Sequence, residues 1–289
     1  MPVRTSAVGE TLVHECEVPT RWALAYAAVT GFTQDQCFDD TRAGGVVLPP
    51  TFCVAPEWAI GGGDARTAAL GLSWDERRRG VHVLQDSLFH APIRAGMRLR
   101  CEGTVVQIRA TSAGSYVLTR YDTREIETGD LLATSFSGGM IRGIAPDGPD
   151  RGDTPAELLP EPRPAPADGA RATALALDKG LPHVYSECAQ IWNPIHSERR
   201  VALAAGLPDV IIHGTITWTL TGREAVRLHA GGDVTKLKRL SGRFRAPVPA
   251  GVGIVVRDAA RDDEAGLVDL EVATAGGAVA LSHGLAVFA

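Results

Sequence analysis

The stretch Phe89–Met97 reads FHAPIRAGM, and the stretch Phe244–Val252 reads FRAPVPAGV. Both fit one pattern, F-x-A-P-(I/V)-x-A-G followed by an apolar residue, and 244 minus 89 gives an offset of 155 residues. In both cases two β-rich segments follow, and then an apolar strand candidate rich in small residues. A shared motif followed by the same order of elements predicts an internal duplication.

Each half also has a helical stretch before these strands. In the first half it is Pro50–Ile60, because proline is tolerated in a first helical turn, and Gly61–Gly63 ends it. In the second half a short helix is predicted at Ser197–Ala205, with Ser197 as its N-cap, and a longer apolar helix at His213–Leu228. One dominant apolar helix followed by antiparallel strands predicts an α+β unit, in which the sheet wraps around the helix. The predicted strands are Leu99–Ile108, Tyr116–Tyr121 and Leu131–Met140 in the first half, and Gly253–Arg257, Leu267–Ala273 and Ala278–Phe288 in the second.

A proline-rich segment separates the two halves. Prolines stand at 155, 160, 162, 164 and 166, among acidic and small residues. Such a segment cannot hold a helix or a central strand, and it is typical of a semi-extended linker. The sequence therefore predicts an N-terminal domain at 1–145, a linker at 146–170 and a C-terminal domain at 171–289.

The composition limits the possible functions. A chain of 289 residues with 45% hydrophobic and 22% charged residues is typical of a soluble globular protein, and a net charge of −5 does not favour nucleic-acid binding. The five cysteines are scattered, without a CxxC pair, which predicts neither a disulfide framework nor a zinc site. The start of the chain lacks the apolar core of a signal peptide, and the most apolar long window, Val201–Leu220, contains Pro208 and Asp209. We therefore expect a cytoplasmic protein that binds neither nucleic acid nor membrane.

The second half contains the most informative motif. Tyr185–His196 reads YSECAQIWNPIH, and Ile211–Gly214 reads IIHG. These segments resemble the MaoC-like family of (R)-specific enoyl-thioester hydratases and dehydratases, whose motif is Y-A-x-x-S-G-D-x-N-P-(I/L)-H, then a helix and a His-Gly pair. The stretch Gly44–Phe52, GGVVLPPTF, resembles the substrate-shaping first half of double-hotdog members. The resemblance covers nearly the whole chain and implies two tandem hotdog domains.

One departure from the family motif bears on the chemistry. In the family, an Asp two residues before the Asn works with the His to position and activate water, and that position here is Ile191. Isoleucine can neither accept a proton nor orient water. The corresponding stretch of the first half, Thr30–Asp35, has neither Asn-Pro nor His. The candidate carboxylates to replace this Asp are those of Glu187, Asp35 and Asp39.

The resemblance assigns roles to the remaining motif residues. His196 is the expected general base or acid, and the amide of Gly214, at a helix start, is expected to polarise a thioester carbonyl. Asn193 either orients the substrate or stiffens the turn that holds His196. Structural alternatives remain open: His196 and His213 as helix-start residues, and the two tryptophans as core residues. The residues expected to line the substrate are Ile191, Trp192, His213, Thr215 and Trp218.

Three functions remain open from the sequence. A dry site with one base and no water-positioning carboxylate favours an amine or amino acid as the nucleophile, because a free amine attacks an enoyl β-carbon without prior deprotonation. The alternatives are a conventional hydratase or dehydratase with another carboxylate, and a non-catalytic thioester-binding subunit. The expected substrate is an acyl thioester of coenzyme A or an acyl carrier protein, with no cofactor and no metal, and homodimers are expected by analogy. The basic residues are either a solvated strand face or a carrier-binding site; they are Lys236, Lys238, Arg239 and Arg243.

Overall fold

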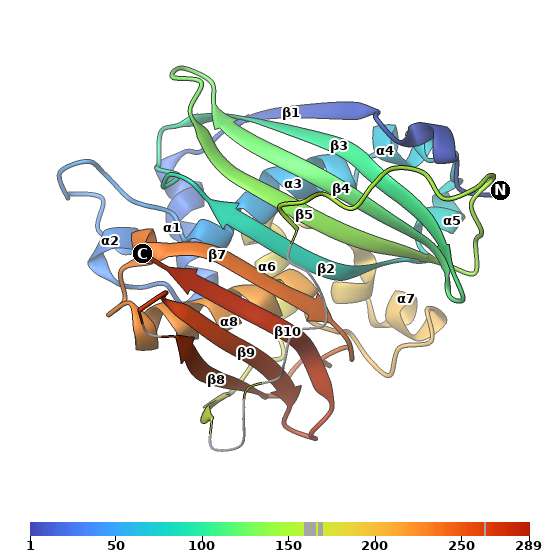
Figure 1. The fold of residues 1–289 in the computed structure, drawn as a ribbon. Coiled ribbons are helices and arrows are strands. Elements are labelled where there is room, and N and C mark those ends of the chain that lie inside the picture. The colour runs from blue at the N-terminus through green and yellow to red at the C-terminus, as the bar shows by residue number, and fades with distance from the viewer. Residues whose placement is uncertain (159–165, 167–169, 263) are drawn as a thin grey trace.

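The structure, a computed structural model, describes residues 1–158, 166, 170–262 and 264–289. Within them, ten strands form one antiparallel sheet in the order β1-β3-β4-β5-β2-β7-β10-β9-β8-β6 (Figure 1). The strands are β1 (Thr11–Glu17), β2 (Gly80–Phe89), β3 (Arg98–Thr111), β4 (Gly114–Glu125), β5 (Leu131–Arg142), β6 (Arg171–Leu175), β7 (Leu237–Phe244), β8 (Ile254–Asp262), β9 (Leu267–Thr274) and β10 (Val279–Phe288).

The two halves of the sheet repeat one another. The order β1-β3-β4-β5-β2 of the first half recurs as β6-β8-β9-β10-β7 in the second, and the halves join where β2 pairs with β7. Asp86 pairs with Ser241 in this register, and these two residues are themselves separated by 241 minus 86, or 155 residues. A twofold-like axis therefore passes through this pair, as the repeated Phe89 and Phe244 motif predicts.

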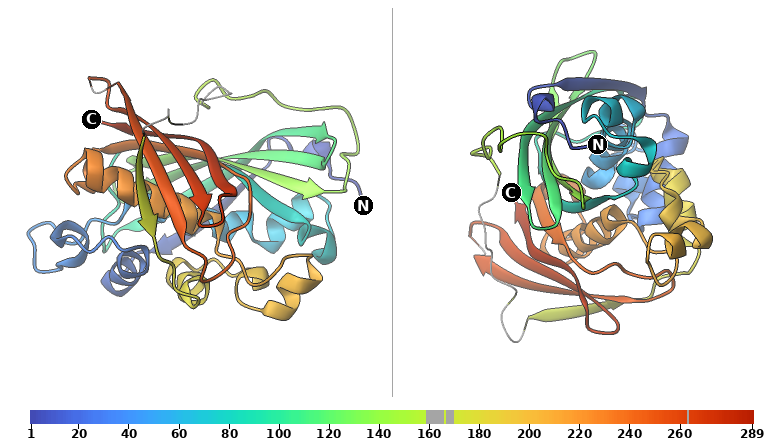
Figure 2. Two further views of the ribbon diagram at one scale, coloured as in Figure 1. Left: turned by 90° about the horizontal axis from the view of Figure 1, so that it is seen from below. Right: turned by 90° about the vertical axis from the view of Figure 1, so that its right-hand side faces the viewer.

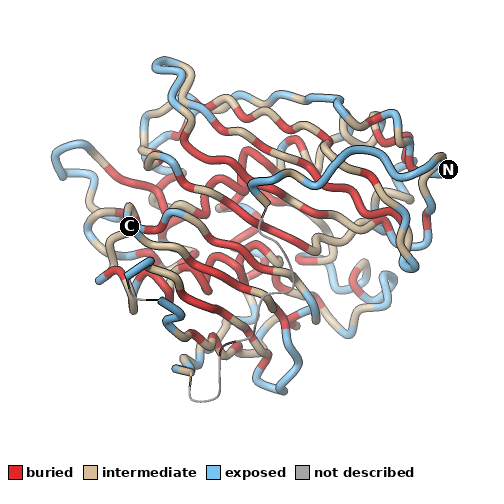
Figure 3. Tube along the Cα trace, viewed as in Figure 1, coloured by how far each residue is buried: buried red, intermediate tan, exposed pale blue. Residues whose placement is uncertain are grey.

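The helices lie on the concave side of the curved sheet, which wraps around them (Figure 2). Buried residues run along the inner strands and the helices beneath them (Figure 3). Nearly every residue from Thr215 to Val226 of the longest helix is buried. The α-helices are α1 (Thr20–Thr30), α2 (Asp35–Phe38), α3 (Val54–Gly61), α4 (Asp64–Ala69), α5 (Trp74–Arg77), α6 (Leu181–Ala189), α7 (Arg199–Ala204) and α8 (Gly214–His229); the 3-10 turns are η1 (Thr5–Ala7), η2 (Pro50–Cys53), η3 (Pro194–His196) and η4 (Val234–Lys236).

The repeat extends to matching tyrosines on the helices. The hydroxyl of Tyr26 in α1 donates to the carbonyl oxygen of Thr51 at 2.9 Å, and the hydroxyl of Tyr185 in α6 donates to Thr215 Oγ1 at 3.1 Å. Thr51 and Thr215 both lie at the start of the central helical segment of their half, η2–α3 or α8. Equivalent positions in the central helices therefore differ by 164 residues, which is 215 minus 51.

One predicted helix is corrected by the structure, and part of the predicted linker is described. The helix predicted from Ser197 begins at Arg199 with Glu198 as its N-cap, because Ser197 ends the preceding 3-10 turn. The first part of the predicted linker packs along the sheet: Pro146 bridges to Val3, and Arg151 bridges to Ile108. The proline-dense segment itself lies largely outside the described residues, so the domain limits 1–145, 146–170 and 171–289 stay a prediction. Among the described helices, none is both long and apolar enough to cross a membrane.

Candidate active site

The turn after α6 positions the predicted base. Gln190 ends the helix in the left-handed conformation, with φ of 55°, and the Ile191 amide donates to the Ser186 carbonyl at 3.0 Å. The chain then enters η3, whose first amide belongs to Ile195 because Pro194 has none. Asn193 Oδ1 accepts a hydrogen bond from the Ile195 amide at 3.4 Å. Asn193 therefore acts on the turn, as one of its two predicted roles requires.

His196 is held as a neutral base. Its side chain is buried, with 8% exposed, and Nδ1 lies 2.9 Å from the carbonyl oxygen of Ile211. Because a carbonyl only accepts, Nδ1 carries the hydrogen and Nε2 keeps its lone pair. Burial lowers the pKa of His196 to about 4, and the bond to Ile211 opposes that shift. At neutral pH the ring therefore presents an unprotonated Nε2.

His213 stacks on this ring. The two ring centroids lie 3.7 Å apart at an interplanar angle of 24°. Nε2 of His213 lies 3.1 Å from the Ile191 carbonyl oxygen and 3.2 Å from Ser186 Oγ, so it donates to the carbonyl. Burial, together with the neighbouring His196, lowers the pKa of His213 well below its ordinary value. Its buried Nδ1 has no partner among the described atoms, which leaves an acceptor beside His196.

The start of α8 lies directly after His213. Gly214 is its first residue, so the Gly214 amide has no acceptor within the helix and lies at the positive end of the helix dipole. A Cβ at this position would meet the Phe244 ring at 3.1 Å, so the absence of a side chain keeps this approach open. The Phe244 ring in turn lies 4.7 Å from the ring of His82 in β2. The first half therefore contributes to the same end of the β2–β7 junction.

No carboxylate accompanies this histidine pair in the described part of the chain. The hydrogen bonds of the pair end on two backbone carbonyls and one serine hydroxyl. Of the acidic side chains considered from the sequence, Glu187 is exposed and accepts from Trp192 Nε1 at 3.1 Å, and Asp39 accepts from Thr41. Asp35 is exposed at the start of α2. Ile191, at the family's Asp position, is buried with 3% exposed, so the wall on that side is apolar.

Three residues expected to line the substrate lie differently from one another. Trp192 is 56% exposed, and its Nε1 donates a hydrogen bond to Glu187, so it is not a core residue. Trp218 is fully buried, and its ring lies 6.5 Å from that of Phe89, as its interpretation as a core residue predicts. Thr215 Oγ1 accepts from Tyr185, which ties α8 to α6 beside the site.

The predicted basic residues do not share one environment. Lys236 and Lys238 are exposed at the start of β7. Arg239 forms a two-pronged ion pair with fully buried Asp86, at 2.8 and 2.6 Å. Arg243 is half-buried, and burial lowers the pKa of its guanidinium. Arg239 is therefore part of the β2–β7 junction, and of the four only the two lysines are fully exposed.

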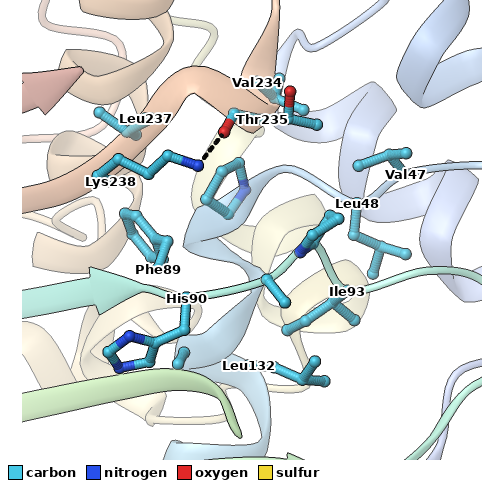
Figure 4. Close-up of a pocket in the computed structure, with 14 residues that line it drawn as sticks. Val47, Leu48, Phe89, His90, Ile93, Leu132, Val234, Thr235, Leu237 and Lys238 are labelled. Atoms are coloured by element: carbon cyan, nitrogen blue, oxygen red, sulfur yellow. Dashed lines mark hydrogen bonds between the residues drawn. The ribbon is translucent and has the colours of Figure 1, made fainter. Parts of the chain in front are cut away.

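A pocket opens at the opposite end of the β2–β7 junction from Gly214 (Figure 4). It is lined by Val47, Leu48, Phe89 and Leu237, and Lys238 lies at its edge, where its Nζ donates to the Thr235 carbonyl at 2.9 Å. By the internal repeat, these positions correspond to those around Gly214 and Phe244. Pro49 and Pro50 stand where the second half has His213 and Gly214, so neither the imidazole nor the free helix-start amide recurs at these two positions.

Two contributions to the site were not predicted from the sequence. His82 was missed because nothing in the local pattern of β2 distinguishes it from a strand residue. Phe244 was recognised only as part of the repeat, although its ring packs against Gly214. Each contact joins segments far apart in the chain, so no local signal marks either one.

Comparisons with known proteins agree with this geometry. The family model for the MaoC like domain matches residues 188–275, which include His196, His213 and Gly214. The 3-hydroxyacyl-thioester dehydratase Y of Mycobacterium tuberculosis is 28% identical over 265 residues, which cover 86% of this chain and 83% of that protein. The peroxisomal multifunctional enzyme type 2 of Mus musculus is 24% identical over 204 residues, but the chain covers only 27% of its length.

Solved structures show the same fold. A MaoC-like dehydratase from Phytophthora capsici superposes with a TM-score of 0.83 at 20% identity, covering 97% of this chain and 95% of that one. A Mycobacterium tuberculosis protein described as having a double hotdog fold superposes with a TM-score of 0.62 at 17% identity, covering 97% and 95%. The predicted α+β class, with two antiparallel sheet halves around central helices, is confirmed. Residues 188–275 therefore form a MaoC like domain, and the chain has the double hotdog fold of its solved neighbours.

Proposed function

We propose that this protein catalyses the reversible addition of water to the C2=C3 double bond of an enoyl thioester. The observation that carries the proposal is the buried, neutral His196, whose Nδ1 is fixed by Ile211 and whose Nε2 is free, near the first amide of α8. A base paired with an oxyanion-stabilising amide is what addition next to a thioester carbonyl requires. The similarity to 3-hydroxyacyl-thioester dehydratase Y supports the same reaction class.

One base serves both directions of this reaction. In dehydration, Nε2 of His196 removes the proton from Cα, and negative charge builds on the thioester oxygen, where the Gly214 amide donates to it. The C–O bond at Cβ then breaks, and His196 returns the proton to the departing hydroxide, which leaves as water. Hydration follows the same steps in reverse. The unpartnered Nδ1 of His213 offers a second acceptor that orients the water molecule.

Amine addition is the second candidate. The observation that favours it is Ile191, a buried apolar side chain where the family has its water-activating Asp. With a pKa of about 4, His196 is a weak base for water. An amine needs no such base before it attacks Cβ, because only the ammonium that forms must lose a proton. This candidate requires the same oxyanion donor and the same histidine.

The form of the substrate is part of the proposal. We assign an acyl thioester of coenzyme A or an acyl carrier protein as the substrate. Lys236 and Lys238 are exposed, but they lie at the end of the β2–β7 junction opposite Gly214, so their contact with the carrier stays a prediction. A thioester binds with its acyl part at Gly214 and its polar carrier outside. That no cofactor or metal takes part, and that the protein is a cytoplasmic homodimer, also stay predictions.

The test is product analysis by mass spectrometry. The purified protein is incubated with a medium-chain enoyl-coenzyme A, with and without a pool of amino acids, and compared with His196→Ala. His183→Ala is the matched control, because His183 is an exposed histidine near the same turn. A water adduct that depends on His196 and not on His183 supports hydration, and an amine adduct supports the second candidate. No adduct of either kind would contradict both and leave a thioester-binding protein.

A further inference from the structure

The first half of the molecule has a polar interior where α3 faces β2 and β5. Glu57 of α3 is buried, with 5% exposed, and its Oε2 accepts a hydrogen bond from Gln85 Nε2 at 3.0 Å. Gln85 Nε2 also lies 3.0 Å from Ser87 Oγ, and Ser87 Oγ lies 2.8 Å from Ser135 Oγ. A carboxyl group and an amide in a hotdog core are costly to bury unless each of their polar atoms has a hydrogen-bond partner.

Some polar atoms of this interior have no hydrogen-bond partner in the described part of the chain. Among the described atoms, Glu57 Oε1 is buried without a hydrogen-bond partner, and so are Oγ1 of Thr119 and Oγ1 of Thr123 on β4. Cys101, paired in register with Thr123, has its thiol pKa raised by burial first and by Glu57 second, so the carboxyl and β3–β4 share one interior. Buried polar atoms in native proteins are almost always satisfied, by protein, water or ligand. Three such polar atoms in one interior, a carboxyl oxygen and two hydroxyls, therefore point to a missing partner.

This interior is continuous with the active site. The His82 ring beside Phe244 has its Nε2 3.0 Å from Ser137 Oγ. Burial lowers the pKa of His82 to about 4, and hydrogen bonds to the Leu84 backbone and to the Gln85 side chain oppose that shift. His82 and Ser137 are half-buried, whereas Gln85 is buried. A path of polar side chains therefore runs inward from Gly214 and Phe244. We call it the polar strip; it consists of His82, Ser137, Gln85, Ser87, Ser135 and Glu57.

The internal repeat provides a built-in comparison. At the 155-residue offset, Leu240 stands where the first half has Gln85, and Leu237 where it has His82. At the 164-residue offset of the central helices, Thr221 stands in place of Glu57, and its hydroxyl donates within the helix to the Thr217 carbonyl at 2.8 Å. The second half therefore fills the equivalent positions with leucines and a satisfied threonine. At these three compared positions, the first half has the more polar side chains.

We propose that the polar strip binds the acyl chain of the thioester, and that this chain carries a hydrogen-bond donor that Glu57 accepts. This proposal rests on the proposed function and adds the substrate class to it. The donor is a hydroxyl or an amino group on the chain beyond Cβ. A wholly apolar chain would leave Glu57 and the threonines unsatisfied, whereas a donor on the chain satisfies Glu57 Oε1 directly.

The test measures binding without turnover, in the His196→Ala background. The probes are enoyl-coenzyme A thioesters of one chain length, either unsubstituted or with a hydroxyl or an amino group placed at successive positions along the chain. Isothermal titration calorimetry is expected to show one substituted probe that binds roughly 10-fold or more tightly than the unsubstituted one. The hydroxyl and amino arms identify which donor Glu57 selects.

Two variants check that Glu57 is responsible. Glu57→Met removes the acceptor at similar length, and it is expected to abolish the preference without lowering the melting temperature. The pair Glu57→Thr and Gln85→Leu copies the second half's own residues and is expected to reverse the preference toward the unsubstituted chain; Thr221→Val is the matched control. Equal binding of all probes, no binding of any, or a preference that survives Glu57→Met would overturn the inference. Turnover of the unsubstituted chain by the wild type would show in each case that the proposed function still stands.

Discussion

The acid sensitivity of folding reports on the state of His196. In an unfolded chain a histidine titrates near pH 6.5, whereas burial lowers the pKa of native His196 to about 4. Between these values the unfolded chain binds a proton that the native protein does not, so stability falls as the pH falls. A difference of about 2.5 pKa units, at 1.36 kcal/mol each, makes this loss about 3 kcal/mol by pH 4. Above pH 6.5 His196 contributes no pH dependence.

Urea unfolding from pH 7 to pH 4 measures this loss. His196→Asn is the informative variant, because its amide still donates to the Ile211 carbonyl but does not titrate. We expect the wild type to lose about 3 kcal/mol more than His196→Asn over this range, and to match the exposed-site control His183→Asn. Parallel curves for the wild type and His196→Asn would refute the reasoning, because they would mean that native His196 takes up its proton as readily as the unfolded chain does.

Three further changes test other parts of the site and its support. Ile191→Asp places a carboxylate in a buried position, so it should lower the free energy of unfolding, measured in urea, by roughly 3–5 kcal/mol. The same carboxylate should raise the rate of hydration. An unchanged rate would show that the apolar side chain of Ile191 does not limit water addition. Gly214→Ala brings a Cβ to 3.1 Å from the Phe244 ring, so the amide should shift and kcat/KM should fall roughly 10-fold. The double variant with Phe244→Leu should recover part of this activity. No recovery would show that the contact with the ring does not cause the loss. Arg239→Leu removes the two-pronged ion pair with buried Asp86 and should cost about 3–5 kcal/mol, measured by urea unfolding; a loss under 1 kcal/mol would mean that this ion pair contributes little to the β2–β7 junction.

Much of the fold follows from local patterns. The repeated motif at Phe89 and Phe244 predicts the duplication, because the two copies begin at the ends of the junction strands β2 and β7 and each leads into the next strand of its half. The strands after it are apolar, and the last strand of each half is rich in small residues, so their positions could be predicted to within a few residues. The helices α1 and α6 were missed, since each is short and neither was singled out by its apolar pattern.

The site could be predicted only where its residues are close in sequence. His196 and Gly214 belong to one motif, but the stacking of His196 on His213 depends on how η3 and the start of α8 meet. Trp192 is exposed after the left-handed turn at Gln190, and this turn could not be predicted because residues other than glycine rarely adopt a positive φ. Arg239 could not be assigned to Asp86 from sequence, because the pair forms across the β2–β7 junction, 153 residues apart.

The central claim is that His196 and Gly214 together direct addition to, and elimination from, an acyl thioester. The most direct measurement is NMR of a carbon-13-labelled enoyl thioester in heavy water with wild type and His196→Ala. We expect that deuterium enters Cα as the nucleophile joins Cβ, that the thioester stays intact, and that both changes are lost in His196→Ala. Release of the free acid, or addition that persists without His196, would contradict it.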